Sequence, residues 1–245
     1  MKFSNEINEF LIGKKFSSGL DIHFSDRKYP DLTRIEKIID LTRDKRIIHV
    51  GCADHLPLID EKIKNKKWLH GLLNKSTAEC AGVDINSEAV KYINEKLNIN
   101  NVYLTGIETD KLLLQAEKKW DYMVLGEIIE HVDNPVAFLH ELRTKYGKQV
   151  DKIIISAPNV FNLLTIKDIY GNKENINTDH RYWFSPFTLT KIILQSGYRQ
   201  PEIYFVERVK LPLIKAVVKR LKMIFGIPLY FEPNCFSNII LVANF

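Results

Sequence analysis

The sequence predicts an α/β fold, built on a seven-stranded, mostly parallel sheet with helices on both faces. Short runs rich in β-branched and aromatic residues alternate with amphipathic runs along the 245 residues, as is typical of a parallel sheet covered by helices. Hydrophobic residues make up 45% of the chain and charged residues 27%, which suits a globular protein with a sizeable core. This composition argues against collagen-like, coiled-coil and largely disordered architectures.

Seven runs have the composition of strands. The first, Arg46 to Val50, leads directly into Gly51. The others are 80–84, 101–105, 120–125, 152–156, 201–206 and 237–243. Such short apolar runs are expected where a strand is covered on both faces.

The predicted helices lie between these strands. Ser87 is a suitable N-cap for one of them, and Asn134 followed by Pro135 marks the start of another. A third covers 186–195 and ends before Gly197. The apolar face of the first of these helices consists of Ala89, Val90, Ile93 and Leu97.

We predict one domain over residues 1–245, with a core of 45–206 and 237–245 and two additions. The N-terminal addition, 1–44, is expected to be helical in part, over 32–41. The second addition is an insertion, 207–236, between the last two strands.

Within the insertion, residues 211–225 interleave apolar side chains with cations. The cations are Lys215, Lys219, Arg220 and Lys222. Four interpretations stay open: a helix packed on the domain with a solvated face, an anionic substrate surface, a peripheral membrane contact and a dimer contact.

Cysteine content favours a cytoplasmic protein, and the expected partner is a small-molecule or glycan acceptor. The three cysteines include no C-x-x-C pair, so neither a disulfide framework nor a zinc knuckle is indicated. The first 20 residues lack the apolar core of a signal peptide, and no apolar run is long enough to span a membrane. A net charge of +5 permits an anionic substrate but does not require nucleic acid. The oligomeric state is not indicated.

Two strand ends suggest a nucleoside site. Gly51 follows the first strand, where a missing side chain lets a ligand approach the backbone. Asp84 ends the second strand, and a carboxylate there can accept both hydroxyl hydrogens of a ribose. Ligands of open α/β sheets bind beyond these carboxyl ends. Turn residues at strand ends are the alternative interpretation.

The fourth strand and its continuation, Trp120 to Pro135, carry a more specific motif. Asp121 is followed by the five residues Tyr-Met-Val-Leu-Gly, two of which match the apolar positions of the motif, and then by Glu127-Ile-Ile-Glu130-His131. This succession resembles class I S-adenosylmethionine-dependent methyltransferases, in the branch with an E-x-x-E-H motif. The resemblance covers roughly 45–200 and the last strand. It implies a Rossmann-like sheet whose last strand runs antiparallel beside the fifth.

The resemblance also implies a role for each matching residue. Gly51 and Ala53 would lie against the methionine part of the cofactor, and Asp84 would hold the ribose. Ile85 and Ile107 would cover the two faces of the adenine. The implied cofactor-binding set is Gly51, Cys52, Ala53, Asp84, Ile85, Ile107, Glu108, Leu125, Gly126 and Glu127. Part of 1–44 would form a lid.

The sequence departs from this family at three places. His49 stands where an acid is usual, and Gly106 stands where an aspartate usually contacts the adenine amino group. The usual G-x-G-x-G reads Gly51-Cys52-Ala53-Asp54-His55 and keeps one glycine. His55 is expected to close one side of the pocket or to contact the substrate.

A second cluster suggests the methyl acceptor chemistry. An alcohol is a poor nucleophile, so its methylation needs a general base or a metal. If Glu127 starts a helical turn, Glu130 and His131 lie on the same face. His180, in a segment that follows the fifth strand, is a candidate base or a further ligand. We therefore predict His131 and His180 as catalytic residues.

The same residues also suggest a metal site. Glu127, Glu130, His131 and His180 would be the ligands of a divalent ion such as Mg²⁺ or Mn²⁺, because ubiquinone-pathway and small-RNA methyltransferases bind metal through a similar cluster. A base without a metal and a structural role are the alternatives.

The preferred function is S-adenosylmethionine-dependent O-methylation of a sugar or sugar phosphate of a bacterial surface polysaccharide, because 177–197 resembles segments of such enzymes. A quinone-like or phenolic acceptor is the first alternative, and RNA is the next. A non-catalytic binding module is the alternative from another class, since two motif glycines and the adenine aspartate are missing.

Overall fold

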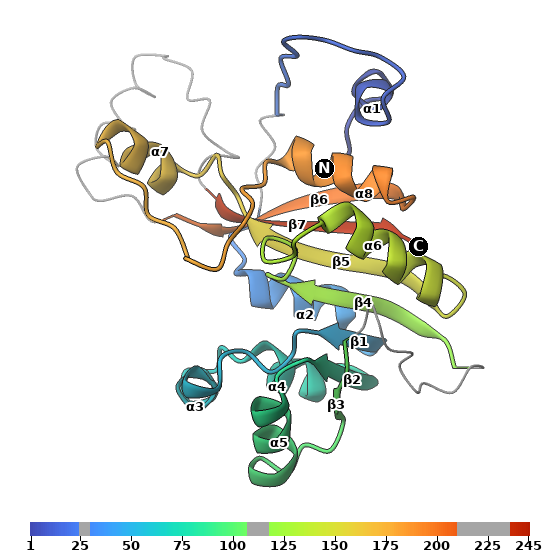
Figure 1. Cartoon of the computed structure of the whole chain (residues 1–245), viewed down its shortest axis with the longest axis vertical. Helices are drawn as coiled ribbons and strands as arrows, with labels where there is room; N and C mark the ends of the chain where they lie inside the picture. Colours follow the sequence, from blue (N-terminus) through green and yellow to red (C-terminus); the bar gives the residue numbers. More distant parts are fainter. Residues whose placement is uncertain (25–29, 107–117, 210–235) are drawn as a thin grey trace.

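We describe a computed structural model of the chain over residues 1–24, 30–106, 118–209 and 236–245. Its centre is a seven-stranded sheet in the order β3-β2-β1-β4-β5-β7-β6 (Figure 1). The strands are β1 (Arg46–Val50), β2 (Glu79–Asp84), β3 (Val102–Leu104), β4 (Trp120–Gly126), β5 (Val150–Pro158), β6 (Arg199–Arg208) and β7 (Phe236–Asn244). The first five are parallel, and β7 runs antiparallel to both of its neighbours. The predicted fold class and the antiparallel last strand are confirmed.

Helices cover both faces of this sheet (Figure 1). They are α1 (Asn5–Leu11), α2 (Arg34–Thr42), α3 (Leu56–Lys64), α4 (Leu69–Ser76), α5 (Ser87–Lys96), α6 (Pro135–Tyr146), α7 (Leu163–Tyr170) and α8 (Pro186–Gln195). Side chains alternate between the two faces of a strand. Ile153 and Ile155 therefore pack in the cluster with α6 and α8, whereas Ile154 packs in the cluster with α2 and α4.

The helix starts follow local capping chemistry. Asn134 caps α6 by accepting from the Ala137 amide, with Pro135 as the first helical residue, as predicted. The predicted N-cap of α5 was wrong by one position: Asn86 accepts from the Ala89 amide, and Ser87 is already helical. Either residue can cap a helix, and the backbone of Asn86 is the extended one.

The insertion predicted over 207–236 overlaps two strands. Strand β6 runs on to Arg208, and β7 begins at Phe236. The helix predicted over 211–225 lies outside the described residues. At the other edge of the sheet, the predicted strand 101–105 is shorter and covers only Val102–Leu104. None of the helices in the described ranges has the length and apolar character needed to cross a bilayer.

Candidate functional site

An open cleft lies at the carboxyl ends of β1, β2 and β4. Its volume is about 1210 Å³. Gly51, Asp84 and Gly126 line it from the strand ends, and His131 and His180 line it from the segments that follow β4 and β5. Parallel strands bring their carboxyl ends to one edge of the sheet, which is where open α/β folds bind ligands. The cleft therefore unites residues that the sequence predicted for two separate purposes.

The turn after β1 is shaped for close approach. Gly51 has a φ of +65°, and a Cβ there would lie 2.2 Å from Ile128 Cδ1. A side chain at this position would be strained by the backbone and would also collide with the segment after β4. Glycine therefore keeps this wall of the cleft at backbone level.

Asp84 is held firmly at the rim of the cleft. Its Oδ2 accepts from the Ala53 amide at 2.9 Å, and its Oδ1 accepts from the Asn86 amide at 2.9 Å. Each carboxylate oxygen has a second lone pair. The carboxylate is thus fixed in orientation and still able to accept bonds from a ligand.

The other predicted cofactor residues occupy different depths. Ile85 is 77% exposed and lines the cleft beside Asp84. Cys52 also lines the cleft, although its side chain is buried. Ala53 and Leu125 are fully buried and are not among the residues that line the cleft. Ile107 and Glu108 lie outside the described residues. His55 lines the cleft, as predicted for that side of the pocket.

Arg34 is a site residue that sequence reasoning missed. It begins α2, yet its guanidinium reaches the cleft, where its Nη2 lies 3.3 Å from Glu127 Oε2. The capping box of Thr33 and Glu36 fixes where α2 starts and so places Arg34. The side chains of Arg34 and Glu127 are 16% and 35% exposed. This ion pair offers both signs of charge beside the ends of β1 and β4.

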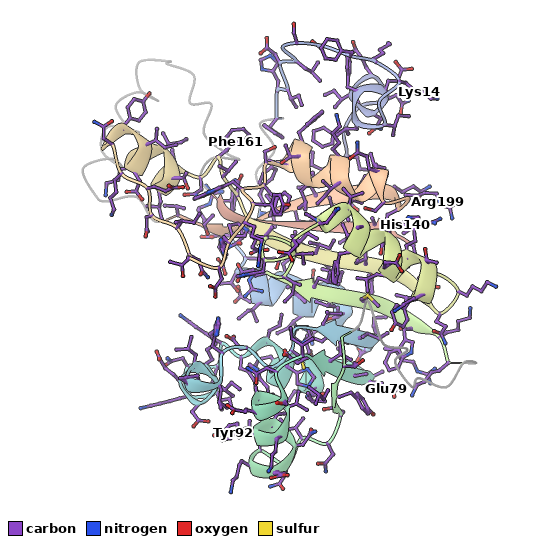
Figure 2. The ribbon with its side chains drawn as sticks, in the orientation of Figure 1. Lys14, Glu79, Tyr92, His140, Phe161 and Arg199 are labelled. Carbon is purple, nitrogen blue, oxygen red and sulfur yellow. The ribbon has the colours of Figure 1, made fainter. Side chains whose placement is uncertain are left out.

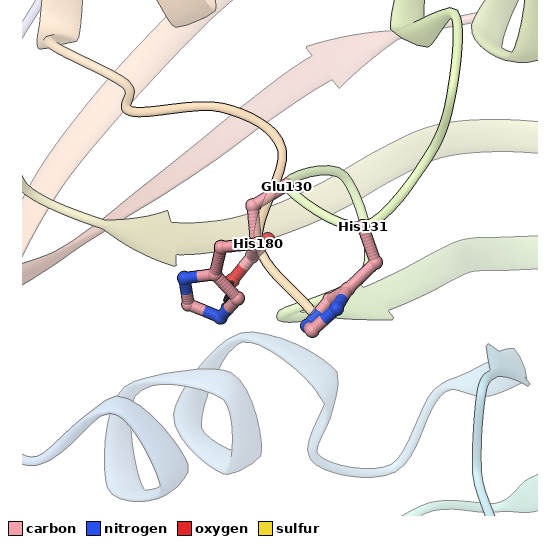
Figure 3. Close-up of side chains that lie close together, drawn as sticks. All are labelled: Glu130, His131 and His180. Carbon is pink, nitrogen blue, oxygen red and sulfur yellow. Dashed lines mark ion pairs between the residues drawn. The ribbon is translucent and has the colours of Figure 1, made fainter. Parts of the chain in front are cut away.

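His131 and His180 line the other half of the cleft, and the buried Glu130 lies next to both of them (Figure 3). One candidate ligand atom from each lies within 4.8 Å of the others. His180 Nε2 is 4.0 Å from Glu130 Oε1, and the two imidazole rings meet edge to face with centroids 4.7 Å apart. The segments after β4 and β5 thus bring together three of the four predicted ligands.

The Glu130 carboxyl group is unusual in its surroundings. It is fully buried, and within the described part of the chain neither of its oxygens has a hydrogen-bond partner. Burial raises its pKa to about 8. Burial and the neighbouring His131 lower the pKa of His180. A carboxyl group that is buried, unpartnered and next to two imidazoles is typical of a functional site.

Glu127 does not join this cluster, contrary to the prediction. That prediction assumed a helical turn from 127 to 131, but Glu127 has a φ of +57° and so leaves the helical path. The Ile128 carbonyl instead accepts from the His131 amide, which closes a turn one residue later. The Glu127 carboxylate consequently points to Arg34.

A pair of histidines lies beneath the cofactor half of the cleft. His49 and His70 are buried, and their rings stack with centroids 5.5 Å apart and Nδ1 atoms 3.3 Å apart. Burial lowers the pKa of His70 to about 4 and the pKa of His49 well below its usual range.

Comparison with known proteins identifies the fold. No protein-family model and no curated protein matches the sequence. Among solved structures, the chain is similar to a SAM-dependent methyltransferase from Archaeoglobus fulgidus, with a TM-score of 0.54, 20% identity, and coverage of 86% of this chain and 91% of the other. It is also similar to the small RNA methyltransferase HEN1, with a TM-score of 0.55, 18% identity, and coverage of 90% and 27%.

The methyltransferase domain of a bacterial Hen1 protein is a third match, with a TM-score of 0.51, 14% identity, and coverage of 86% and 97%. At these identities the likeness concerns the fold. The chain therefore has the class I fold of SAM-dependent methyltransferases.

Proposed function

We propose that this protein transfers a methyl group from S-adenosylmethionine to a hydroxyl oxygen of a sugar. The observation that carries the proposal is the cluster of Glu130, His131 and His180, whose two histidines line the same cleft as Gly51 and Asp84. The first group suits acid–base chemistry on an acceptor. The second suits a nucleoside cofactor on the class I fold.

The residues of the cofactor half fit S-adenosylmethionine. The Gly51 turn, where Ile128 leaves no space for a Cβ, presents backbone to the cleft, and the oriented Asp84 carboxylate suits a ribose diol. The Arg34–Glu127 pair adds a cation for the carboxylate and an anion for the ammonium group of an amino acid. These features lie along one wall of the cleft, as a nucleoside joined to an amino acid requires.

In the proposed reaction, the acceptor oxygen attacks the methyl carbon in line with the sulfur. The O–C bond forms while the C–S bond breaks, and its electron pair stays on sulfur to give S-adenosylhomocysteine. The proton of the acceptor hydroxyl passes to an imidazole nitrogen of His180 or His131. His180 is ready to accept it, because the lowered pKa keeps this imidazole neutral at neutral pH.

The same cluster fits a divalent cation. The two unpartnered oxygens of Glu130 and the nitrogens of His131 and His180 are a suitable donor set. A bound cation would supply Lewis acidity that lowers the pKa of the acceptor hydroxyl. Within this proposal the three side chains hold the ion, and Glu127 stays with Arg34.

A sugar acceptor is favoured by the lining of the cleft near the cluster. Asn134, Asn177 and Asp179 offer amide and carboxylate groups to hydroxyls. Apart from the imidazoles of His131 and His180, Phe138 is the one aromatic side chain among the described lining residues of this half. A quinone-like or phenolic acceptor, the first alternative, would be expected to need more aromatic surface for stacking. Surface polysaccharide precursors are the sugar class that we would test first.

RNA is a second candidate, for one specific reason. Two of the similar structures are Hen1 methyltransferases, and one of these two is a small RNA methyltransferase. An RNA 2′-hydroxyl is also a sugar hydroxyl. RNA binding would fall steeply with salt, whereas binding of a neutral sugar would not. Methyl transfer from labelled S-adenosylmethionine to RNA, to saccharide precursors and to catechols separates these acceptors.

Thermal unfolding tests the cofactor directly. S-Adenosylhomocysteine at 100 times its Kd should add about 2.7 kcal/mol to the free energy of unfolding, a Tm increase of roughly 5–10 °C. NADH serves as the control ligand. If neither ligand raises the Tm, the result would favour the binding-module alternative. A chelator that reduces turnover but not the Tm increase would support a metal on the acceptor side.

Asp84→Asn should weaken cofactor binding and leave the fold intact. The amide keeps one of the two oxygens that accept from backbone amides and loses the charge that strengthens bonds to a ribose. The Kd for S-adenosylhomocysteine should therefore rise about 10–100-fold by calorimetry. Asp151→Asn is the matched control, because Asp151 is exposed at the opposite end of the sheet. Equal affinity in the Asp84 variant would contradict the ribose assignment.

Arg34→Met should reveal where the amino acid end of the cofactor binds. We expect a roughly 10-fold loss of affinity for S-adenosylhomocysteine, since one charge-assisted bond is removed. Binding of 5′-methylthioadenosine, which lacks the amino acid group, should stay unchanged. Arg199→Met is the matched control, because Arg199 projects from the far end of β6 (Figure 2). An equal loss of affinity for S-adenosylhomocysteine and for 5′-methylthioadenosine would mean that Arg34 does not bind the amino acid end of the cofactor.

A further inference from the structure

His180 belongs to a segment with few attachments. Residues 171–179 are exposed, as are Arg181, Tyr182 and Trp183, and the chain becomes buried again only at Phe184. Such an exposed segment does not by itself hold an imidazole in one place. The position of His180 against Glu130 and His131 therefore needs a local cause.

That cause is a set of contacts from the two residues that follow His180. The Arg181 amide donates to the Glu130 carbonyl at 2.8 Å. The Arg181 guanidinium donates through Nη1 to the His131 carbonyl and pairs through Nε with Asp133 Oδ1 at 2.8 Å. The Tyr182 hydroxyl donates to the Asp133 carbonyl at 2.7 Å. These contacts join the His180 segment to the turn that carries the other two cluster residues.

We propose that Arg181 is a positioning residue, which clamps the His180 segment onto residues 130–133 and so aligns the His180 imidazole with Glu130 and His131. The planar guanidinium reaches two acceptors at once, which an ammonium group cannot do in the same geometry. Its effect on turnover rests on the proposed methyl transfer, but its effect on the position of His180 does not.

The exposure of the Arg181 and Asp133 side chains distinguishes the positioning role of Arg181 from a contribution to global stability. The side chains of Arg181 and Asp133 are 52% and 88% exposed. Exposed ion pairs contribute little to global stability. Loss of the Arg181 side chain should therefore loosen one segment and leave the sheet and the cofactor half unchanged.

The test uses Arg181→Met and Arg181→Lys in the full chain, with Arg199→Met as the matched control. The chain has seven histidines, so selective labelling gives a simple spectrum. Rings with centroids 4.7 Å apart should give a nuclear Overhauser effect between His131 and His180. We expect this signal to disappear in Arg181→Met, to weaken in Arg181→Lys and to persist in Arg199→Met.

Turnover gives the second readout. In Arg181→Met, kcat should fall about 10–100-fold, as is usual when a group that orients a site residue is lost, while the Kd for S-adenosylhomocysteine stays within about 2-fold. Arg181→Lys should recover part of kcat. An Overhauser signal and a kcat that survive in Arg181→Met would overturn the proposal, as would a wild-type protein without the signal.

The two proposals fail in different ways. A wild-type protein that binds no S-adenosylhomocysteine and transfers no methyl group would refute the proposed function, and the Overhauser measurement would still decide the role of Arg181. If Arg181→Met does not fold by circular dichroism, Arg181→Lys and Asp133→Asn carry the same comparison, because each weakens the clamp and retains polar character.

Discussion

Glu130→Gln is expected to lower kcat for methyl transfer by about 10²–10⁴-fold, the range for loss of an acid–base group. The amide replaces a buried carboxyl group whose Oε1 lies 4.0 Å from His180 Nε2 and whose oxygens have no hydrogen-bond partners in the described ranges. Unlike the carboxyl group, the amide cannot release a proton, so it can neither become the anion that steadies a protonated imidazole nor provide an anionic donor to a cation. Both versions of the proposed chemistry therefore lose a necessary group.

The fold should tolerate this change. Because burial raises the pKa of Glu130 to about 8, the carboxyl group is mostly protonated at neutral pH, and glutamine resembles that neutral form in size and polarity. The Kd for S-adenosylhomocysteine should stay within about 2-fold of wild type. Initial rates measure kcat, and calorimetry measures the Kd. Glu95→Gln, on the exposed side of α5, is the matched control. An unchanged kcat would remove Glu130 from the mechanism.

Local patterns in the sequence predicted the sheet and much of the site. Strand β1 matches its predicted range, and α8 begins and ends where Pro186 and the residues before Gly197 indicate. The E-x-x-E-H motif predicted that Glu130 and His131 lie together, and the resemblance suggested His180. These predictions depend on local residue spacing or on a fixed sheet topology. Both can be recognised from the order of apolar, polar and turn residues in a sequence.

Features that depend on packing between distant segments could not be predicted. Arg34 is far from β4 in sequence, and only the packing of α2 against the sheet brings it to Glu127. The positive φ of Glu127 gave no signal either, because a glutamate is seldom found in that conformation. Glu127 was therefore predicted for a cluster that it does not join, and Arg34 was not predicted beside the cleft.

The stacked pair of His49 and His70 is another contact of this kind, and it leads to a prediction about stability. Both pKa values lie below the ordinary 6.5 because the rings are buried. Below pH 6.5 the unfolded chain binds protons that the folded protein excludes, so the free energy of unfolding falls as the pH falls. For His70 this loss begins near pH 6.5 and is complete near pH 4.

Other groups face the pair and must be separated from it. His49 faces Arg34, and Cys80 Sγ lies 3.7 Å from His70 Nδ1. Glu130 acts in the opposite sense, since its raised pKa makes the folded protein bind a proton more strongly than the unfolded chain. The total pH dependence therefore mixes both signs, and a difference between two proteins is the informative quantity.

His70→Asn should remove one histidine from this balance. Between pH 7 and pH 5, one excluded proton costs about 2 kcal/mol, so the variant should lose about 2 kcal/mol less than wild type over this interval. Urea unfolding at pH 7, 6 and 5 measures the difference, and cavity effects of the substitution cancel because they do not depend on pH. His140→Asn, on the exposed side of α6 (Figure 2), should follow wild type. Parallel curves for His70→Asn and wild type would mean that His70 titrates normally in the folded protein, and the buried pair would then have to open to water.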